Sequence, residues 1–509
     1  MENNNSYEKF LACVKQKTNA EQMTMECSVG FDAEDDVAKV LSIDVCAEIS
    51  NVECLNGEAN VNGNMVIGLI YSTINNAIKK VNFVSAFSAK IQDDFIVPDC
   101  KVLAKAEINE ATISNLSSSS AKVLITYTIC LDCAKNQEID YLCGASDDIC
   151  LKNSETTAMF ASSCANYDFV EHNSFELKEP IQTLLSSVSQ IVCDGYETSY
   201  NTLTINGKIV NKIIYLTDEE VPMLKTIQNV FDFKQDIEIE GLGKESVVDF
   251  ELQLQNKDAK TTIDEKAEQT TIELELPIRA CVIVYENKTI LTVSDLFSTK
   301  NNVLVTSMGY NNCVVKAPQF FEKQIDGSLN LTENEPRIDK LLAVTYSRAT
   351  ILSSYIKDEQ IYVEGIAEAN LIYLNDEENK LCSVDIEIPF VAQNATDFSD
   401  TAQLSVRASL CDVDVVVKKG RDVYFDAKLC VFVVATECDG QMVISGVEVA
   451  EALPPKDAGI EIYFAKSGEE VWDIAKQLKC EPSLVETQNS KLTFPLEKDE
   501  NIAVFYGKN

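Results

Sequence analysis

The chain is 509 residues long, which is enough for several domains that each bury a core of their own. It has 43 Lys and Arg against 81 Asp and Glu, and the net charge of −38 disfavours binding to nucleic acid or to anionic membrane surfaces. Because His172 is the single histidine, the multi-histidine metal sites of hydrolases are excluded, and a Ser-His-Asp or Cys-His arrangement would have to use it.

The N-terminal part of the chain predicts neither export nor a membrane anchor. Residues 1–24 form a polar segment with Asn, Glu and Lys where an export signal needs an apolar stretch. No run approaches 18 apolar residues, so no membrane span is expected. Without export, the 18 cysteines are expected to be reduced thiols in a cytosol rather than a disulfide framework.

A short motif occurs three times, with a Gly eight residues before the Tyr of a Leu/Ile-Ile-Tyr sequence. The three pairs are Gly63 with Tyr71, Gly207 with Tyr215, and Gly365 with Tyr373. The copies lie 144 and 158 residues apart, which is the spacing of whole domains and too long for a solenoid repeat. An even spacing places Gly and Tyr on one face of an extended strand, where every second residue is mostly apolar. A glycine on this buried face indicates a bulge or a close approach of another backbone.

The surroundings of the motif also repeat. A pair made of an apolar residue and Leu lies about 22 residues before each Gly, and a Phe lies about 16 or 17 residues after each Tyr. These pairs are Val40-Leu41, Leu184-Leu185 and Leu341-Leu342, and the aromatic residues are Phe87, Phe231 and Phe390. Apolar alternation with period two is common in these regions and helical periodicity is scarce, which is typical of antiparallel sandwiches or barrels.

The predicted fold class is therefore mainly β. We expect three tandem antiparallel β-sandwich or barrel-like domains followed by a small β-α-α-β domain. The expected bounds are 25–150, 170–305 and 325–450 for the three β-rich repeats and 458–509 for the small domain.

Catalytic and metal signals are weak. His172 lies in a stretch predicted to be a linker between the first two repeats and to face solvent. Cys130 and Cys133, followed by Cys143 and Cys150, have the spelling of a zinc site, but residues three apart on a strand point to opposite faces. We therefore predict no enzyme, no catalytic residue, no metal and no cofactor.

The C-terminal residues have a different pattern. An alternating strand at 460–464 precedes a turn at Ser467 and Gly468, which is suited to begin a helix. Apolar residues at helical spacing follow up to Leu478, Pro482 begins a second short helix, and a strand at 502–506 closes the unit. Trp472 is assigned to the core of this unit by its helical spacing.

The stretch from Tyr463 to Lys476 resembles a LysM domain, with its Lys-Ser-Gly turn followed by an apolar-Trp-x-Ile-Ala helix. Asn489 also falls where that family usually has Asn. The resemblance implies binding of N-acetylglucosamine chains through two loops. Here Glu469-Glu470 replaces Asp-Thr in the first loop, and Asp499 stands where the second has Gly. Peptidoglycan or N-acetylglucosamine-glycan binding is thus kept as the alternative function.

Three such repeats followed by a LysM-like unit resemble the SPOCS-repeat family of spore-coat morphogenesis proteins. The Gly-to-Tyr strand followed by an apolar-Pro-Phe segment carries this resemblance, and the third repeat, with Ile388-Pro389-Phe390, is the most typical. This resemblance implies a mother-cell cytoplasmic protein at the forespore surface. In that family the LysM unit contacts the coat basement-layer ATPase, stage IV sporulation protein A. The resulting expectation is a non-enzymatic scaffold that docks a coat protein.

The expected binding residues lie in the two LysM loops, which are predicted to be exposed. They are Ser467, Gly468, Glu469 and Glu470 in the first loop, and Leu496, Glu497, Lys498, Asp499, Glu500 and Asn501 in the second.

Overall fold

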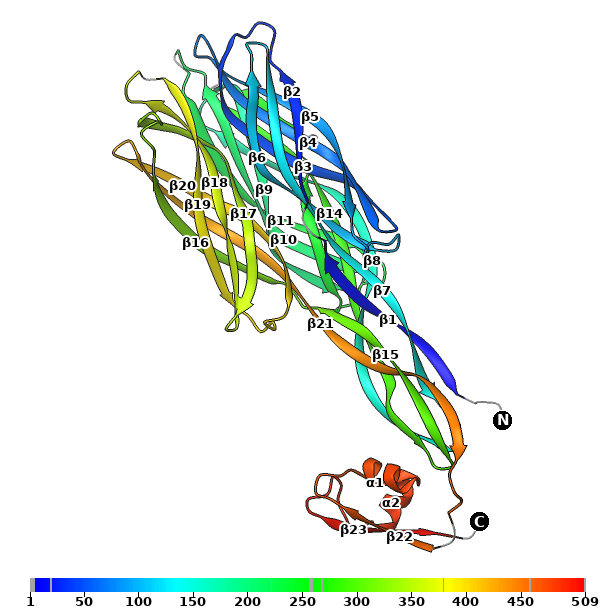
Figure 1. Ribbon diagram of the computed structural model, residues 1–509. Coiled ribbons are helices and arrows are strands. Elements are labelled where there is room, and N and C mark those ends of the chain that lie inside the picture. Colours follow the sequence, from blue (N-terminus) through cyan, green and yellow to red (C-terminus); the bar gives the residue numbers. More distant parts are fainter. Residues whose placement is uncertain are drawn as a thin grey trace.

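The computed structural model describes residues 5–18, 21–220, 222–255, 260–266, 269–378, 380–456 and 459–507. Figure 1 shows three β domains packed side by side into a broad body, from which a narrower stalk leads to a small module. The fold is mainly β, as expected, and all strand pairs are antiparallel. Neither helix in this part of the chain is long and apolar enough to cross a lipid bilayer.

The strands form three successive repeats of similar order. Repeat 1 comprises β1 (Ser6–Lys17), β2 (Glu21–Gly30), β3 (Val37–Leu55), β4 (Glu58–Thr73), β5 (Ile78–Gln92), β6 (Lys101–Leu116) and β7 (Ser120–Gly144). Repeat 2 comprises β8 (Ile149–Leu177), β9 (Ile181–Ser199), β10 (Thr202–Thr217), β11 (Leu224–Glu238), β12 (Val247–Leu254), β13 (Lys260–Lys266) and β14 (Gln269–Ser298). Repeat 3 comprises β15 (Asn301–Val315), β16 (Gln319–Asn330), β17 (Ile338–Lys357), β18 (Gln360–Asn375), β19 (Leu381–Ala395), β20 (Gln403–Lys418) and β21 (Asp422–Ala452). In repeat 2, the single strand β8 takes the place of two strands, and β12 and β13 take the place of one.

Each repeat consists of two facing sheets. The three-stranded sheets are β3-β4-β5, β9-β10-β11 and β17-β18-β19, and the motif strand is the central one in each. The four-stranded sheets are built on the long last strands β7, β14 and β21. Motif strand β4 alternates half-buried and buried positions from Glu58 to Leu69, because one face packs on the opposite sheet, and it is buried on both faces from Leu69 to Thr73.

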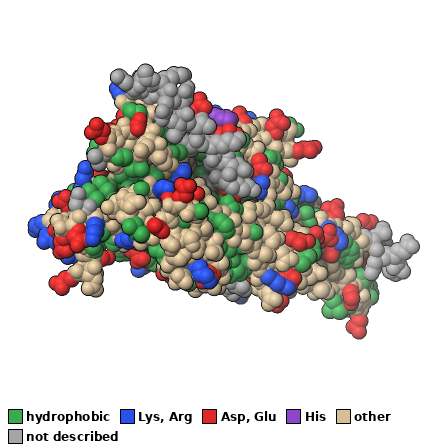
Figure 2. All heavy atoms as spheres, turned by 90° about the horizontal axis from the view of Figure 1, so that it is seen from above, with side chains coloured by type: hydrophobic (Ala, Val, Ile, Leu, Met, Phe, Trp, Pro, Cys, Tyr) green, Lys and Arg blue, Asp and Glu red, His purple; other side chains and the backbone are tan. Residues whose placement is uncertain are grey.

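The strand pairing extends each repeat further upstream than the sequence indicated. In repeat 1, β1 pairs with β7 from Ser6 onward. In repeats 2 and 3, the first strands β8 and β15 pair with the last strands β14 and β21. These strands expose one face to solvent, so their polar composition resembles a linker. His172 accordingly lies in β8, opposite Glu275, rather than in a linker, and its side chain is exposed (Figure 2).

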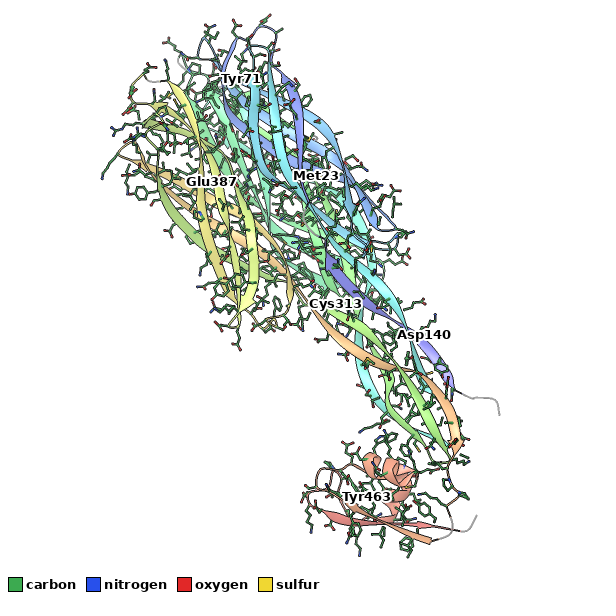
Figure 3. All side chains as sticks on the ribbon, in the orientation of Figure 1. Met23, Tyr71, Asp140, Cys313, Glu387 and Tyr463 are labelled. Atoms are coloured by element: carbon green, nitrogen blue, oxygen red, sulfur yellow. A yellow bond between two sulfur atoms is a disulfide. The ribbon has the colours of Figure 1, made fainter. Side chains whose placement is uncertain are left out.

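One cysteine pair differs from the expectation of reduced thiols. Cys313 in β15 and Cys438 in β21 face each other in the register and form a disulfide near the junction of body and stalk (Figure 3). The composition argument treats all cysteines alike and cannot detect two that become cross-strand neighbours. Within the described ranges, no group of three or more His, Cys, Asp or Glu is placed to hold a metal ion.

The motif glycine makes room for two neighbours at once. A Cβ atom on Gly63 would lie 2.2 Å from the backbone oxygen of Glu48 and 2.7 Å from the ring of Phe87. The pairing of β3 with β4 skips a residue between Ile49 and Asn51, so a bulge pushes the carbonyl toward the glycine. Both interpretations of the sequence, a bulge and a close backbone approach, are therefore correct.

The other two copies have the same geometry. A Cβ on Gly207 would lie 2.3 Å from the backbone oxygen of Val192, and one on Gly365 would lie 2.3 Å from that of Thr350. The aromatic partner of Gly207 is Phe233, which corrects the sequence assignment of Phe231. Phe231 lies two residues before Phe233 on β11 and pairs with Ile209. It therefore has the right parity along the strand but is not the residue opposite the glycine.

The motif tyrosines are buried, and Tyr71 of repeat 1 lies at the wide end of the body (Figure 3). Tyr71 donates a hydrogen bond of 2.7 Å to Asp35, which is also paired with Lys79. The hydrogen bond from Lys79, with that from Tyr71, lowers the pKa of Asp35. Tyr215 donates to Glu179 at 2.5 Å, and Tyr373 donates to the backbone oxygen of Pro336 at 3.0 Å. The motif is therefore structural in all three repeats.

The three repeats form a closed ring. β5 lies against β9, β11 against β17, and β19 against β3, so repeat 3 returns to repeat 1. The Ile of each Leu/Ile-Ile-Tyr sequence points to the ring interior, away from its own sandwich core. A shared apolar cluster there contains Leu41, Ile70, Leu185, Ile214, Ala343 and Ile372.

A buried ion network joins the same three repeats. Asp249 of repeat 2 is fully buried and accepts from Lys15 of repeat 1 at 2.9 Å and from Arg407 of repeat 3 at 3.0 Å. Arg407 is also paired with Glu251. Burial alone would raise the pKa of Asp249, but the charges of Lys15 and Arg407 outweigh it and lower the pKa.

The stalk consists of the outer ends of β1, β7, β8, β14, β15 and β21. The first strands of the three repeats contact one another there, and so do the last strands. Phe10 stacks edge-on against Tyr141 and Tyr310 with ring centroids 5.5 Å apart in both pairs, which joins repeats 1 and 3.

We predict that Gly63→Ala destabilises the protein by roughly 1–3 kcal/mol or more, because the new methyl group overlaps a backbone oxygen and an aromatic ring. Gly68→Ala in the same strand is the matched control, since its nearest neighbour would be 3.6 Å away. Urea unfolding measures both variants. Equal stability of the two would contradict this account of the motif.

Lys212 in β10 provides a second test, based on pH. Its buried ammonium has no hydrogen-bond partner among the described atoms, and burial lowers its pKa to about 8. Below pH 8 the charged form destabilises the fold, and this penalty is relieved as pH rises toward the unfolded value of 10.5. We expect Lys212→Met to stabilise the protein at pH 7 by on the order of 2–3 kcal/mol, with a smaller gain at pH 9.5.

The control for this substitution is Lys208→Met in the same strand, where the side chain is 41% exposed and paired with Asp194. This variant should give no gain in thermal stability at either pH. A Lys212→Met variant that behaves like Lys208→Met would disprove the buried-charge argument.

Candidate functional site

The C-terminal module is a small unit at the end of the stalk. It comprises β22 (Gly459–Ala465), α1 (Val471–Leu478), α2 (Pro482–Gln488) and β23 (Glu500–Tyr506). The α1 side chains that follow helical spacing pack on the inner face of the β22–β23 sheet. The core of the module includes Ala465, Trp472, Ile474, Val485, Ile502 and Val504.

The turn before α1 is shaped by two local features. Gly468 has a φ of +91°, which favours glycine. Glu470 and Asp473 form a reciprocal capping box that satisfies backbone N–H groups at the start of α1. The helix therefore begins just after Glu470, two or three residues later than the start at Ser467 or Gly468 that the sequence indicated.

The two expected loops lie together. The backbone N–H of Gly468 donates to the oxygen of Leu496 at 2.7 Å, and the N–H of Leu496 donates to the oxygen of Glu469 at 3.1 Å. Ser467 donates its backbone N–H to Asp499 at 2.9 Å and its hydroxyl to the backbone oxygen of Glu497 at 2.9 Å. These hydrogen bonds hold Ser467 to Glu469 against Leu496 to Asp499, so the two loops lie side by side.

Three of these residues differ from a simple exposed loop. Leu496 is only 3% exposed and belongs to the core of the module. Glu500 and Asn501 belong to strand β23, where Asn501 pairs with Phe464. Lys498 is strongly exposed and pairs with Glu500 at 3.2 Å.

Trp472 has a role that its helical spacing did not reveal. It is buried in the module, yet its indole N–H donates to Asp295 in β14 at 2.8 Å. Its ring also meets Phe297 edge-on at 5.0 Å. The residue therefore links the module to repeat 2, which is not its neighbour along the chain.

Charged contacts complete this joint. Lys476 donates to both carboxylate oxygens of Asp295, at 2.6 and 2.7 Å, and Glu470 pairs with Lys152 of β8 at 2.7 Å. Burial alone would raise the pKa of Asp295, but hydrogen bonds from Lys476 and Trp472 outweigh it and lower the pKa. Local sequence patterns carry no signal for Asp295, because it lies 177 residues from Trp472.

An exposed apolar face lies on the other side of the module. Ile460, Ile462 and Phe464 alternate along β22 and are 61%, 58% and 75% exposed. Phe505 of β23 lies opposite Ile460 and is 53% exposed. The alternating pattern at 460–464 correctly predicted strand β22, but its apolar side chains face outward and not into the core of the module. Figure 1 shows α1 and α2 between this sheet and the stalk, so the apolar face lies at the far end of the molecule.

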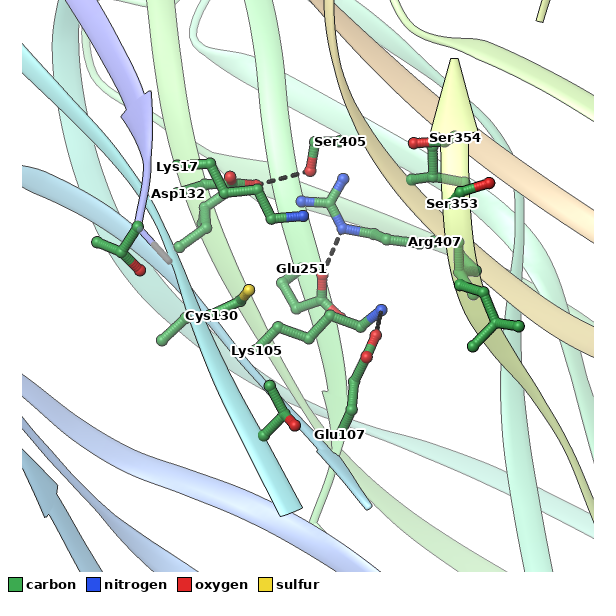
Figure 4. A pocket seen from close by; sticks show the side chains of 17 residues that line it. Lys17, Lys105, Glu107, Cys130, Asp132, Glu251, Ser353, Ser354, Ser405 and Arg407 are labelled. Carbon is green, nitrogen blue, oxygen red and sulfur yellow. Dashed lines mark hydrogen bonds and ion pairs between the residues drawn. The ribbon is translucent and has the colours of Figure 1, made fainter. Parts of the chain in front are cut away.

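A second candidate is a cavity of about 470 Å³ where the three repeats meet (Figure 4). Three cations and three carboxylates line it, and the carboxylates already accept from neighbours. Ser405 donates to Asp132 at 2.6 Å, Arg407 is paired with Glu251, and Lys105 is paired with Glu107. The arrangement places no histidine near a nucleophile, and its charges connect repeats to one another.

Comparison with known proteins gives one match. The family model described as SipL, SPOCS domain matches residues 36–115, which extend from the start of β3 to the end of β6 and include the Gly63–Tyr71 strand. This match supports a SPOCS domain in repeat 1 and a sporulation-related protein. No curated protein and no solved structure matches the chain.

We predict that Asp295→Ala releases the module from the stalk, because Trp472 and Lys476 lose their shared acceptor. Trp472 is the single tryptophan of the chain, so its fluorescence reports this contact directly. The variant should shift the emission and make Trp472 more accessible to a neutral quencher. Asp147→Ala, at an exposed site of the same end of the molecule, is the control and should change neither. Unchanged quenching in Asp295→Ala would contradict the docked arrangement.

Proposed function

We propose that this chain is a non-enzymatic scaffold in the assembly of the spore envelope, and that its C-terminal module docks a coat protein. The observation that carries the proposal is the apolar face formed by Ile460, Ile462, Phe464 and Phe505. A cluster of large, strongly exposed apolar side chains on one face is typical of an interaction surface. The match of repeat 1 to a SPOCS domain supports the sporulation setting.

The position of this face supports the same proposal. The module is tied to repeat 2 by Trp472, Lys476 and Glu470, all on the side that faces the stalk. The apolar face is therefore held in a fixed orientation, so a partner meets an ordered surface and less conformational entropy is lost on binding. The body acts as a rigid platform that carries this surface.

The partner follows from resemblance. Three β repeats and a LysM-like module resemble the arrangement in which the LysM unit contacts the coat basement-layer ATPase, stage IV sporulation protein A. The proposed location is the mother-cell cytoplasm at the forespore surface. The chain is strongly acidic, which disfavours a phosphate-rich partner. The apolar contact face fits a protein partner.

Glycan binding is the second candidate, and the joined loops favour it. Ser467 to Glu469 and Leu496 to Asp499 form one edge, as a two-loop glycan site requires. Glu470 of the first loop is engaged with Lys152, so this edge is partly committed to the joint with repeat 2.

The test is a pull-down from sporulating cells with the full chain as bait. We expect Ile462→Glu with Phe464→Glu to reduce the captured coat protein at least tenfold, because burying two unpaired carboxylates in an apolar contact costs several kcal/mol. Lys498→Gln, an exposed change in the same module, is the control and should capture normally. Trp472 fluorescence confirms that the variants keep the docked fold.

Two outcomes would contradict the proposal. Full capture by the double variant would exclude the apolar face. Saturable binding of chitin oligomers that is lost on Gly468→Val but kept in the double variant would favour the glycan function instead. Deletion of residues 458–509 should abolish capture of the coat protein if the module docks that protein, and should abolish binding of chitin oligomers if the module binds glycan.

A further inference from the structure

Two thiols of repeat 3 lie unusually close together. The sulfur atoms of Cys411 in β20 and Cys430 in β21 are 3.1 Å apart, and either can donate to the other. Both side chains are nearly buried, at 7% and 8% exposure, and they pack against Val192 and Val210 of repeat 2. The pair therefore lies in the joint between repeats 2 and 3, separate from the Cys313–Cys438 disulfide.

The backbone explains why the two sulfurs meet. The pairing of β20 with β21 skips residues between Cys411 and Asp414, so a bulge directly follows Cys411. Asp412 in the bulge has a φ of 49°, in the left-handed region that L-residues rarely adopt. Its side chain accepts from Gln228 of β11 at 3.3 Å, so the bulge itself contacts repeat 2.

The pair differs chemically from the other buried thiols. Burial raises the pKa of Cys193 to about 12, which keeps that thiol protonated and unreactive. In the pair, the hydrogen bond from Cys430 lowers the pKa of Cys411. A thiolate with a second thiol in contact has both a nucleophile and a resolving group.

A cavity large enough for a small oxidant borders the pair on the side of Cys430. Cys430 lines a cavity of about 140 Å³ together with Val192, Phe250 and Arg407. A water molecule needs roughly 10–15 Å³ of such volume, so a molecule the size of hydrogen peroxide fits easily.

We propose that Cys411 and Cys430 are a peroxide-reactive thiol pair that closes to a second disulfide in repeat 3. One thiolate attacks a peroxide oxygen, the O–O bond breaks, and the released hydroxide takes up the thiol proton as water. The second thiol attacks the resulting sulfenic acid and releases a second water, so two thiols and one hydrogen peroxide give one disulfide and two waters. The new bond fixes the bulge at Asp412 and with it the contact to repeat 2.

The experiment uses the full chain, treated with hydrogen peroxide, alkylated at the remaining thiols and digested without reductant. We expect a linked peptide pair containing Cys411 and Cys430 in most molecules, lighter by two hydrogens than the sum of the free peptides. Alkylation of both cysteines after peroxide, or a link between Cys430 and Cys193, would overturn the proposal.

Two variants sharpen the result. In Cys430→Ser the resolving thiol is gone, so Cys411 should proceed to the sulfinic acid and gain two oxygens. Cys193→Ser is the matched control and should still form the Cys411–Cys430 link. The melting temperature of peroxide-treated wild type should rise by several degrees, whereas that of treated Cys430→Ser should not. An unchanged wild-type melting temperature would refute the proposed stiffening.

Discussion

The architecture depends on one buried carboxylate, Asp249, held between cations from two other repeats. Its contacts with Lys15 and Arg407 cross both of the boundaries that repeat 2 makes with its neighbours. A buried charge without its partners costs several kcal/mol, so Asp249 is stable only when all three repeats are in place. The apolar clusters between the repeats bury most of the surface, and the ion network around Asp249 requires one particular arrangement of the three repeats.

Ring closure determines where the C-terminal module can lie. Because repeat 3 returns to repeat 1, the ends of the first and last strands of all repeats converge into the stalk. Chain that leaves β21 of repeat 3 therefore emerges beside the β8–β14 end of repeat 2. The module docks there through Trp472 and Asp295, and its apolar sheet is turned away from the body. A covalent link to one repeat and a non-covalent link to another hold the module at two points.

Local features of this structure were readable from the sequence, and long-range ones were not. The Gly63–Tyr71 spacing and its two copies predicted three β units, because period-two alternation is a property of the strand itself. The same reasoning selected Phe231 in place of Phe233, since alternation alone does not define register. The β-α-α-β order of the C-terminal module also followed from short-range pattern, although α1 begins later than expected. Lys15, Asp249 and Arg407 could not be connected, because no local pattern joins residues 158 or 234 positions apart. The same holds for Asp295 with Trp472 and for the Cys313–Cys438 disulfide.

The most direct test of the account is whether the three repeats unfold as one body. Hydrogen exchange along a urea titration, followed by peptide in each repeat, measures this without assuming a partner. The account predicts coincident loss of protection in β4, β10 and β18, and an Asp249→Ala variant in which all three shift together to lower urea by an amount equivalent to about 3–5 kcal/mol. Separate transitions, with Asp249→Ala affecting repeat 2 alone, would show three independent tandem domains and contradict the ring.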